Sequence, residues 1–242
     1  DISCNAYQRA KEAIQKGINF IYGFPNNNSL PGYIKHLDYL QLNRPALYYL
    51  ARPLNLKNVL KSKGINFFPI NIFCSAFGLI SSILIKIATN RARKSDIQVY
   101  QVSSFPDDID NLWSYVASNY DIILARNKKY LNWRFLAGPH GFIIFVAKDK
   151  QGNTVGYSVV RIVQINKRKE VIIADFLTFE DNPEVFNKVM STILDFCCSN
   201  HIDLISTWCM ERNYYYKAFL KLGFLPLHKI PVIYYAKSEI GK

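Results

Sequence analysis

The short stretch ARNKKYLNWRF combines residue types that bind charged or sugar-like molecules. Four of its side chains recur at helical spacing, which would place cations and aromatic rings on one helical face. These four residues are Arg126, Tyr130, Trp133 and Arg134. Such a face could bind an anionic or sugar-like molecule, for example the molecule that accepts a group in a transfer reaction. We therefore regard these residues as a candidate acceptor-binding site.

A structural explanation of the same stretch is favoured by the residue types. Trp133 and Leu131 would lie in the core, while the arginines extend to solvent or pair with Asp121 or Asp175. Asp175 interrupts an apolar run, and a carboxylate buried there needs a partner. One of the arginines would supply it.

A second stretch, GFPNNNSLPG, stacks turn residues after an apolar run. The Gly-Phe-Pro-Asn break predicts a sharp turn, and Asn28 or Ser29 can cap the helix that follows. Pro31 fits the early part of that helix. Asn26 to Asn28 either serve only as turn and cap or also contact a ligand, and the residues leave both possibilities open.

Composition limits the partners and the chemistry. The net charge of +12 and the pI of about 9.4 favour anionic partners: nucleic acid, an anionic membrane surface or a phosphorylated cofactor. The five cysteines form no C-x-x-C pair, which predicts reduced thiols and a cytoplasmic location. The four histidines are scattered, so we expect no metal site.

One arrangement of predicted elements occurs twice in the chain. In each copy an amphipathic helix leads into an apolar strand, a polar break, a short helix and a closing aromatic residue. The first copy has its helix at Tyr7–Lys16 and closes at Tyr39. The second has its helix at Val185–Asn200 and closes at Phe224, with Tyr214 to Tyr216 expected in the loop before the short helix.

A longer series of elements precedes the second copy. Alternating and apolar runs predict four strands and one further helix, which together indicate an α/β domain with a mixed sheet. The strands are expected at Asp96–Ser103, Gly141–Asp149, Thr154–Gln164 and Glu170–Phe179, and the helix at Asp107–Ser118. The first copy has no such series, so we expect that half of a domain either is missing upstream or never existed in this chain.

The repeated unit resembles the C-terminal half of GNAT-superfamily N-acyltransferases, in particular two-lobed bacterial members. The matching residues are Leu222-Gly223-Phe224 after Asn213, and more loosely Leu37-Asp38-Tyr39 after Asn26–Asn28. The resemblance implies an α/β (α+β) fold with a mixed, mostly antiparallel sheet flanked by helices. It divides the chain into a partial first lobe (1–60), a connector (61–95) and a degenerate second lobe (96–242).

The resemblance also implies a cofactor and its contacts. In this family an acyl-CoA such as acetyl-CoA lies beside the splayed sheet, which implies cofactor contacts at Phe24, Asn26, Asn28 and Ser29. Family members often carry a tyrosine that protonates the leaving thiolate, and the matching positions here are Ile34 and Phe219. Tyr33, one residue away from the first of these, is the candidate for this catalytic role.

The second lobe departs from the family at the pyrophosphate loop. The family places a glycine-rich R/Q-x-x-G-x-G/A loop at the start of the long helix, where backbone N–H groups hold phosphate. Here Glu180–Phe186 has no glycine and contains three carboxylates. We therefore expect the second lobe not to bind CoA in the usual way, and any cofactor site to belong to the first lobe.

The run Phe67–Thr89 has nearly the ~20 apolar residues that a membrane-spanning helix needs. Its polar residues recur at steps of three and four, which favours a buried connector helix. A helix resting on an anionic membrane is the alternative, and a spanning helix is a third.

Three functions follow from the resemblance. The first is an N-acyltransferase that moves an acyl group, normally acetyl from acetyl-CoA, to a small-molecule amine. Residues 1–242 alone are expected to be inactive or weakly active. The second is an aminoacyl-tRNA-dependent transferase of the Fem type, which suits the positive charge. The third is a non-catalytic binding or scaffold module.

Overall fold

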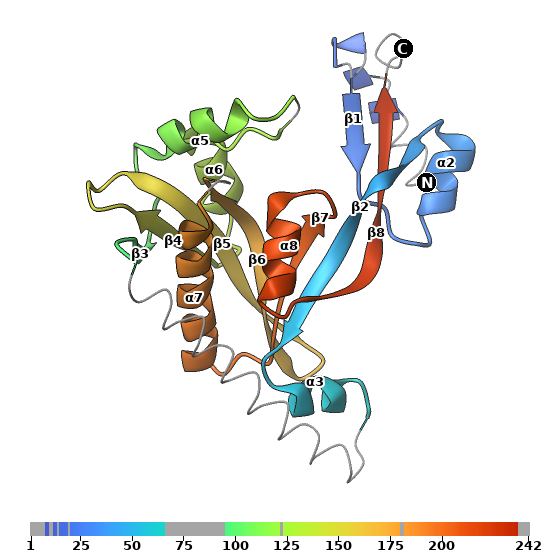
Figure 1. The fold of residues 1–242 in the computed structure, drawn as a ribbon. Helices are drawn as coiled ribbons and strands as arrows, with labels where there is room; N and C mark the ends of the chain where they lie inside the picture. The colour runs from blue at the N-terminus through green and yellow to red at the C-terminus, as the bar shows by residue number, and fades with distance from the viewer. Residues whose placement is uncertain are drawn as a thin grey trace. The chain divides into compact units, whose positions relative to one another are not determined.

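The computed structural model describes residues 8–9, 12–13, 15–18, 20–65, 95–121, 123–179 and 182–236. Eight strands and six helices have defined bounds in this part of the chain (Figure 1). The strands are β1 (Phe20–Gly23), β2 (Leu40–Pro53), β3 (Gln98–Val102), β4 (Phe142–Lys148), β5 (Thr154–Ile165), β6 (Arg168–Thr178), β7 (Leu204–Met210) and β8 (Leu225–Ala236). The helices are α2 (Leu30–His36), α3 (Leu56–Ser62), α5 (Ile109–Ala117), α6 (Lys128–Phe135), α7 (Pro183–Ser199) and α8 (Tyr214–Lys221).

The strands form a mixed, mostly antiparallel sheet in the order β1-β8-β2-β7-β6-β5-β4-β3. This confirms the fold class expected from the sequence. The chain divides into two compact units. Unit 1 comprises residues 1–50 and 208–242, and unit 2 comprises residues 51–207.

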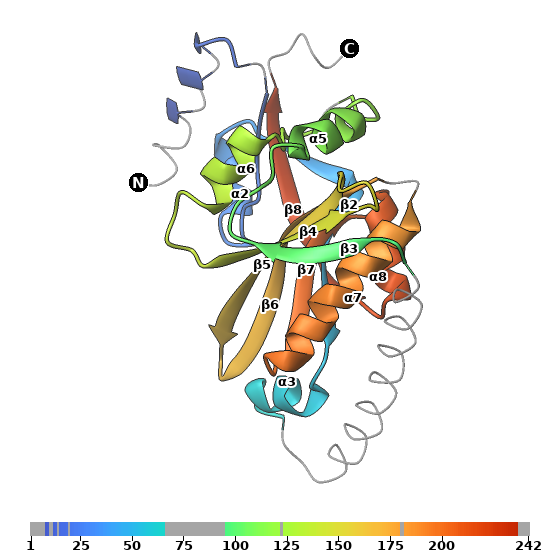
Figure 2. The same ribbon diagram turned by 90° about the vertical axis from the view of Figure 1, so that its left-hand side faces the viewer.

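Unit 2 is a sheet covered on both faces. Side chains of a strand alternate between its two faces, so neighbouring residues pack against different helices. Ile144 and Val146 of β4 belong to a core cluster with residues of α5 and α6. Phe145, between them, contacts Phe196 of α7, with their ring centroids 5.5 Å apart. The helix α7 runs along one face of these strands (Figure 2).

The pairing within unit 2 changes along β6. β6 pairs with β5 in antiparallel register, except that Val159 faces Asp175 while Val160 faces Ile173. Ala174 is therefore an extra residue, as in a β-bulge. On its other side β6 pairs in parallel with β7, from Glu170↔Leu204 to Ile173↔Thr207. The buried Glu170 is bonded to Arg168 and to the Ser206 hydroxyl.

Unit 1 contains an exchange of strands that the sequence pattern did not predict. The strand that follows α2, β2, lies between β8 and β7 in the sheet order. The strand that follows α8, β8, pairs in antiparallel register with β1, from Phe20↔Ala236 to Gly23↔Ile233. The strand that follows the helix in each copy is thus a neighbour of the first strand of the other copy: β8 lies next to β1, and β2 lies next to β7.

Several predicted elements are confirmed and one is wrong. The helices expected at Asp107–Ser118 and Val185–Asn200 correspond to α5 and α7. The three tyrosines at Tyr214–Tyr216 were expected in a loop, but they form the first turn of α8 because Asn213 caps that helix. In the described part of the chain, no helix has the length and apolar character needed to cross a membrane. The predicted Phe67–Thr89 helix lies outside the described residues.

Candidate functional site

A row of aromatic rings lies on the exposed face of β1 in unit 1. Phe20, Tyr22 and Phe24 alternate with more buried residues, so their rings share one side of the strand. Successive ring centroids are 6.2 Å and 5.8 Å apart, and Phe24 lies 5.6 Å from Trp208. We call Phe20, Tyr22, Phe24 and Trp208 the aromatic ladder. Each of the four is about half exposed, which provides an apolar surface for a ligand.

The turn after β1 is organised by Asn26. Its side-chain oxygen accepts hydrogen bonds from the backbone N–H groups of Asn28 (3.1 Å) and Ser29 (2.8 Å). Ser29 is the N-cap residue of α2, but its hydroxyl donates to the Asn26 carbonyl and makes no cap bond. The prediction that Asn28 or Ser29 caps this helix through its side chain is therefore wrong, because Asn26 already satisfies the local donors. Pro31 lies in the first turn of α2, as predicted.

Tyr33 lies in a small cluster of unit 1. Its ring packs edge-on against Tyr39, 5.3 Å away, in a group that includes Leu37 and Ile233. Burial, followed by the proximity of Tyr33 and Tyr235, raises the pKa of Tyr39. Tyr33 is only half-buried, whereas Phe219 in the second copy is buried. The role of Tyr33 as proton donor stays a prediction.

A basic pocket of about 260 Å³ in unit 1 has no counterpart among the sites expected from the sequence. It is lined by Asn43, Arg44, Glu211, Arg212 and Lys229. The Glu211 carboxylate accepts a hydrogen bond of 3.4 Å from the backbone N–H of Ala46. Three cations thus surround one carboxylate, which leaves positive charge to attract a further anion. The pocket joins β2, β8 and the β7–α8 turn, so no local sequence pattern reveals it.

Arg126 in unit 2 is held in an ion pair, so its guanidinium group is not free to bind a ligand. Its Nε lies 3.0 Å from Oδ1 of Asp175, and the Tyr157 hydroxyl donates to Oδ2 at 2.8 Å. Burial is the largest single influence and lowers the pKa of Arg126. The charges of Asp175 and Tyr157 and the hydrogen bond to Asp175 together outweigh it, so the net shift of the pKa is upward. This confirms the pairing that the structural explanation anticipated. Arg126 precedes the N-cap Asn127, so it lies outside the helix α6.

The other three candidate acceptor residues lie on α6. Tyr130 packs against the unit 2 core, with its ring centroid 5.7 Å from that of Trp133. Trp133 is 66% exposed, so the expectation that it lies in the core is wrong. The guanidinium of Arg134 lies over the Phe135 ring, 5.5 Å from its centroid. The structure therefore brings Tyr130 and Trp133 together, whereas Arg126 lies outside the helix and is paired with Asp175. Acceptor binding stays a prediction.

The N-terminus of α7 has few N–H groups left for a phosphate. Pro183 has no backbone N–H. The next two N–H groups, of Glu184 and Val185, already donate to the Asn182 side chain, at 3.1 Å and 3.4 Å. Glu184 also adds negative charge to the first turn. Groups of His, Cys, Asp and Glu side chains able to hold a metal ion are absent from the described residues.

Comparison with known proteins identifies the fold and little beyond it. No family model matches the chain, and no curated protein matches it in sequence. Three solved structures illustrate the similarity of fold. A GCN5-related N-acetyltransferase from Anabaena variabilis has a TM-score of 0.58 at 12% identity, over 96% of this chain and 49% of its own. A conserved protein of Enterococcus faecalis V583, described as a probable N-acyltransferase, has a TM-score of 0.59 at 10% identity, over 97% and 49%. A tandem GNAT protein from the clavulanic acid biosynthesis pathway has a TM-score of 0.55 at 11% identity, over 95% and 68%.

The protein therefore has a GNAT-like fold, similar to GNAT N-acetyltransferases and to tandem members among them. At these identities the likeness concerns the fold. The chain spans about half the length of the Anabaena and Enterococcus proteins.

Proposed function

We propose that the protein takes part in acyl transfer from an acyl-CoA, normally acetyl-CoA, to the amine of a small molecule. The GNAT-like fold is the observation that carries this proposal. The amine nitrogen attacks the thioester carbonyl carbon, and the carbon–sulfur bond breaks. The attacking nitrogen releases one proton to solvent as the amide forms. The CoA thiolate takes a proton from Tyr33, the proposed donor, and Tyr33 regains a proton from solvent. Most of the rate gain in such a reaction comes from orienting the amine and stabilising the oxyanion.

We place the acyl-CoA on the first copy of the repeat, next to Phe24, Asn26, Asn28 and Ser29. Two observations support this choice. The aromatic ladder offers exposed apolar surface beside that turn. The N-terminus of α7, where the family holds pyrophosphate in the corresponding lobe, already uses its N–H groups on Asn182. The division into a partial first lobe (1–60), a connector and a second lobe (96–242) remains part of the proposal.

The second lobe is proposed to bind the acceptor or to act as a scaffold. Arg126 is already paired with Asp175, so the exposed residues of the proposed acceptor site are Trp133 and Arg134. Tyr130, the remaining residue of the site, is partly buried. An exposed tryptophan beside a cation suits a sugar-like or anionic amine.

The test is a calorimetric titration with acetyl-CoA, run on residues 1–242 and on the full product of the gene. In parallel, release of the CoA thiol is measured with a panel of amino-sugars and small amines. We expect the full product of the gene to bind acetyl-CoA and to release thiol in a manner that depends on the amine, and residues 1–242 alone to be inactive or weakly active. Failure of both proteins to bind acetyl-CoA would contradict acyl-CoA chemistry.

An aminoacyl-tRNA donor is the second candidate, and one observation favours it. Such a donor does not need a pyrophosphate-binding helix N-terminus, and the N–H groups at the start of α7 are already bonded to Asn182. The net charge of +12 also suits RNA. Salt-dependent tRNA binding without acetyl-CoA binding would support this candidate. If tRNA does not bind at low salt, it is excluded.

A further inference from the structure

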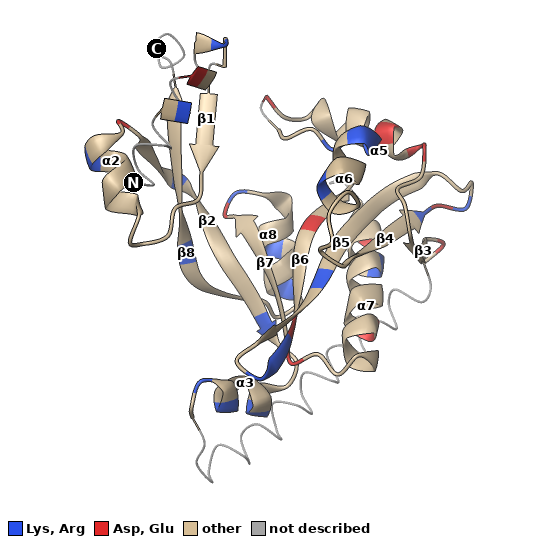
Figure 3. Ribbon diagram, turned by 180° about the vertical axis from the view of Figure 1, so that it is seen from behind, with Lys and Arg blue, Asp and Glu red and all other residues tan. Residues whose placement is uncertain are grey.

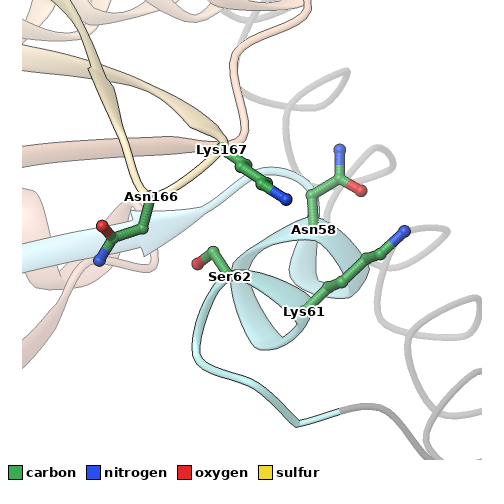
Figure 4. Close-up of a pocket in the computed structure, with 5 residues that line it drawn as sticks. All are labelled: Asn58, Lys61, Ser62, Asn166 and Lys167. Carbon is green, nitrogen blue, oxygen red and sulfur yellow. The ribbon is translucent and has the colours of Figure 1, made fainter.

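A pocket of about 430 Å³ in unit 2 lies at the end of β6 remote from the N-terminus of α7. It is formed by α3 and by the turn between β5 and β6, and is lined by Asn58, Lys61, Ser62, Asn166 and Lys167 (Figure 4). Lys167 reaches from the turn toward Asn58 of α3. Both turn residues have left-handed φ angles, 46° for Asn166 and 66° for Lys167, as in a two-residue hairpin turn. The turn thus fixes one wall of the pocket.

The lining of this pocket is polar and positively charged. Lys61 and Lys167 come from different elements, and no carboxylate lines the pocket. Among the residues that the structure describes, neither ammonium group has a carboxylate within ion-pair distance. Exposed Lys57 and Lys63 add charge on and after α3, and Figure 3 shows these basic residues on α3 and at the turn. Ammonium groups that line the same pocket repel one another, and a bound anion relieves that repulsion.

Asp203, an acidic residue beside the pocket, has both carboxylate oxygens occupied by hydrogen bonds. Asp203 is 6% exposed; its Oδ1 accepts from the Asn58 side chain at 2.7 Å and its Oδ2 from the backbone N–H of Lys169 at 2.8 Å. Its main-chain carbonyl also accepts from Leu54 and Asn55, just before α3. Asp203 therefore fixes α3 next to the turn and holds the pocket open. The hydroxyl of Ser62 already donates to the Val59 carbonyl, so the charged donors of the pocket are the two lysine ammonium groups.

We propose that this pocket binds a phosphate group carried by a small molecule or a lipid headgroup. Ammonium donors from two sides match the several oxygens of a phosphate. The volume of about 430 Å³ leaves room for more than the phosphate itself. This site does not depend on the proposed acyl-CoA site, which lies in unit 1, so either proposal can fail without the other.

The test compares soluble and membrane phosphates. Inorganic phosphate and glycerol 3-phosphate are titrated into the protein by calorimetry, and vesicles of phosphatidylcholine with or without phosphatidic acid are tested by co-sedimentation. The variant Lys61→Gln/Lys167→Gln removes both free cations. We expect it to weaken phosphate binding by at least about tenfold. Loss in the soluble arm identifies a free phosphate compound as the source, and loss only in the vesicle arm identifies a lipid headgroup.

The matched control is Lys129→Gln/Lys217→Gln, which removes the same charge from two exposed lysines elsewhere. This control should bind like the unmodified protein, and Lys61→Arg/Lys167→Arg should retain binding. Equal losses in the pocket variant and the control would show attraction by net charge alone and would overturn the proposal. Absence of binding in both arms would overturn it as well. Circular dichroism spectra that coincide for all variants ensure that the folded proteins are compared.

Discussion

The two copies of the strand–break–helix repeat have the same local design but different surroundings. In each, the side chain of an asparagine after the strand accepts hydrogen bonding from backbone N–H groups that follow it. Asn26 accepts from Asn28 and Ser29 in the break of the first copy, and Asn213 accepts from Tyr215 in the first turn of α8. The helix α8 buries Tyr215 and Phe219, whereas α2 has no buried residue. The helix of the second copy is thus part of the core, whereas the first copy leaves the rings of Phe20, Tyr22 and Phe24 and the amides of Asn26 and Asn28 exposed. This difference is why the first copy is the better candidate for a ligand site.

The largest expected effect concerns the helices of the two copies. Phe219→Ala should lower the free energy of unfolding by about 3–5 kcal/mol, because Phe219 is 2% exposed and packs against Phe224. Ile34→Ala, at the corresponding position of α2, should cost less than about 1 kcal/mol since Ile34 is 40% exposed. Urea unfolding of both variants measures this. Equal losses would show that α2 is as much a part of the core as α8.

Thiol chemistry probes the strand of the second copy. Burial raises the pKa of Cys209 on β7 to about 12, from an ordinary value of 9.0. At pH 8 its thiolate population should fall by on the order of a thousandfold, and alkylation should slow accordingly. Exposed Cys198 serves as the internal control. Mass-spectrometric mapping of iodoacetamide sites in the native protein reports both rates. Rapid labelling of Cys209 would contradict a buried β7.

Acetyl-CoA binding should depend on the first copy, whereas stability depends more on the second. Phe24→Ala should weaken acetyl-CoA binding about tenfold by removing a central ring of the aromatic ladder. Its effect on stability should be small, because Phe24 is half exposed. Tyr100→Ala, at a similarly exposed aromatic residue of β3, is the control and should bind normally. Unchanged affinity in the Phe24 variant would remove the aromatic ladder from the site.

The smallest difference in stability is expected at the two asparagines that accept hydrogen bonds from the backbone, Asn26 and Asn213. Asn213→Ala and Asn26→Ala each remove bonds to backbone N–H groups, and each should cost about 1 kcal/mol in unfolding free energy. Thermal unfolding measures both. Only Asn26→Ala should also reduce acetyl-CoA affinity. Reduced affinity in Asn213→Ala instead would reverse the assignment of the two copies.

The sequence predicted the local elements better than their pairing. Alternation of apolar residues located β4, β5 and β6, and the acidic and proline starts located α5 and α7. The strands β2 and β8 were missed because Pro45, Pro226 and Pro231 interrupt their patterns. Their exchange between the two copies depends on contacts far apart in the chain, which no local periodicity encodes.

The candidate site was predicted unevenly for the same reason. The pairing of an arginine with Asp175 could be anticipated, because a carboxylate in an apolar strand requires a partner. The pocket at Glu211 and the pocket at Lys61 and Lys167 could not, because each collects residues from separate elements. At the break after β1 the sequence offered several capping residues, and only the geometry distinguished Asn26 from Asn28 and Ser29.

The most direct test of the proposed cofactor site is hydrogen–deuterium exchange with and without acetyl-CoA, on the form of the protein that binds it. We predict slower exchange in peptides covering residues 24–36, and no change in peptides covering residues 182–190 at the start of α7. Protection at the start of α7 with none at residues 24–36 would contradict this assignment, because the cofactor would then lie on the second copy despite its capped helix.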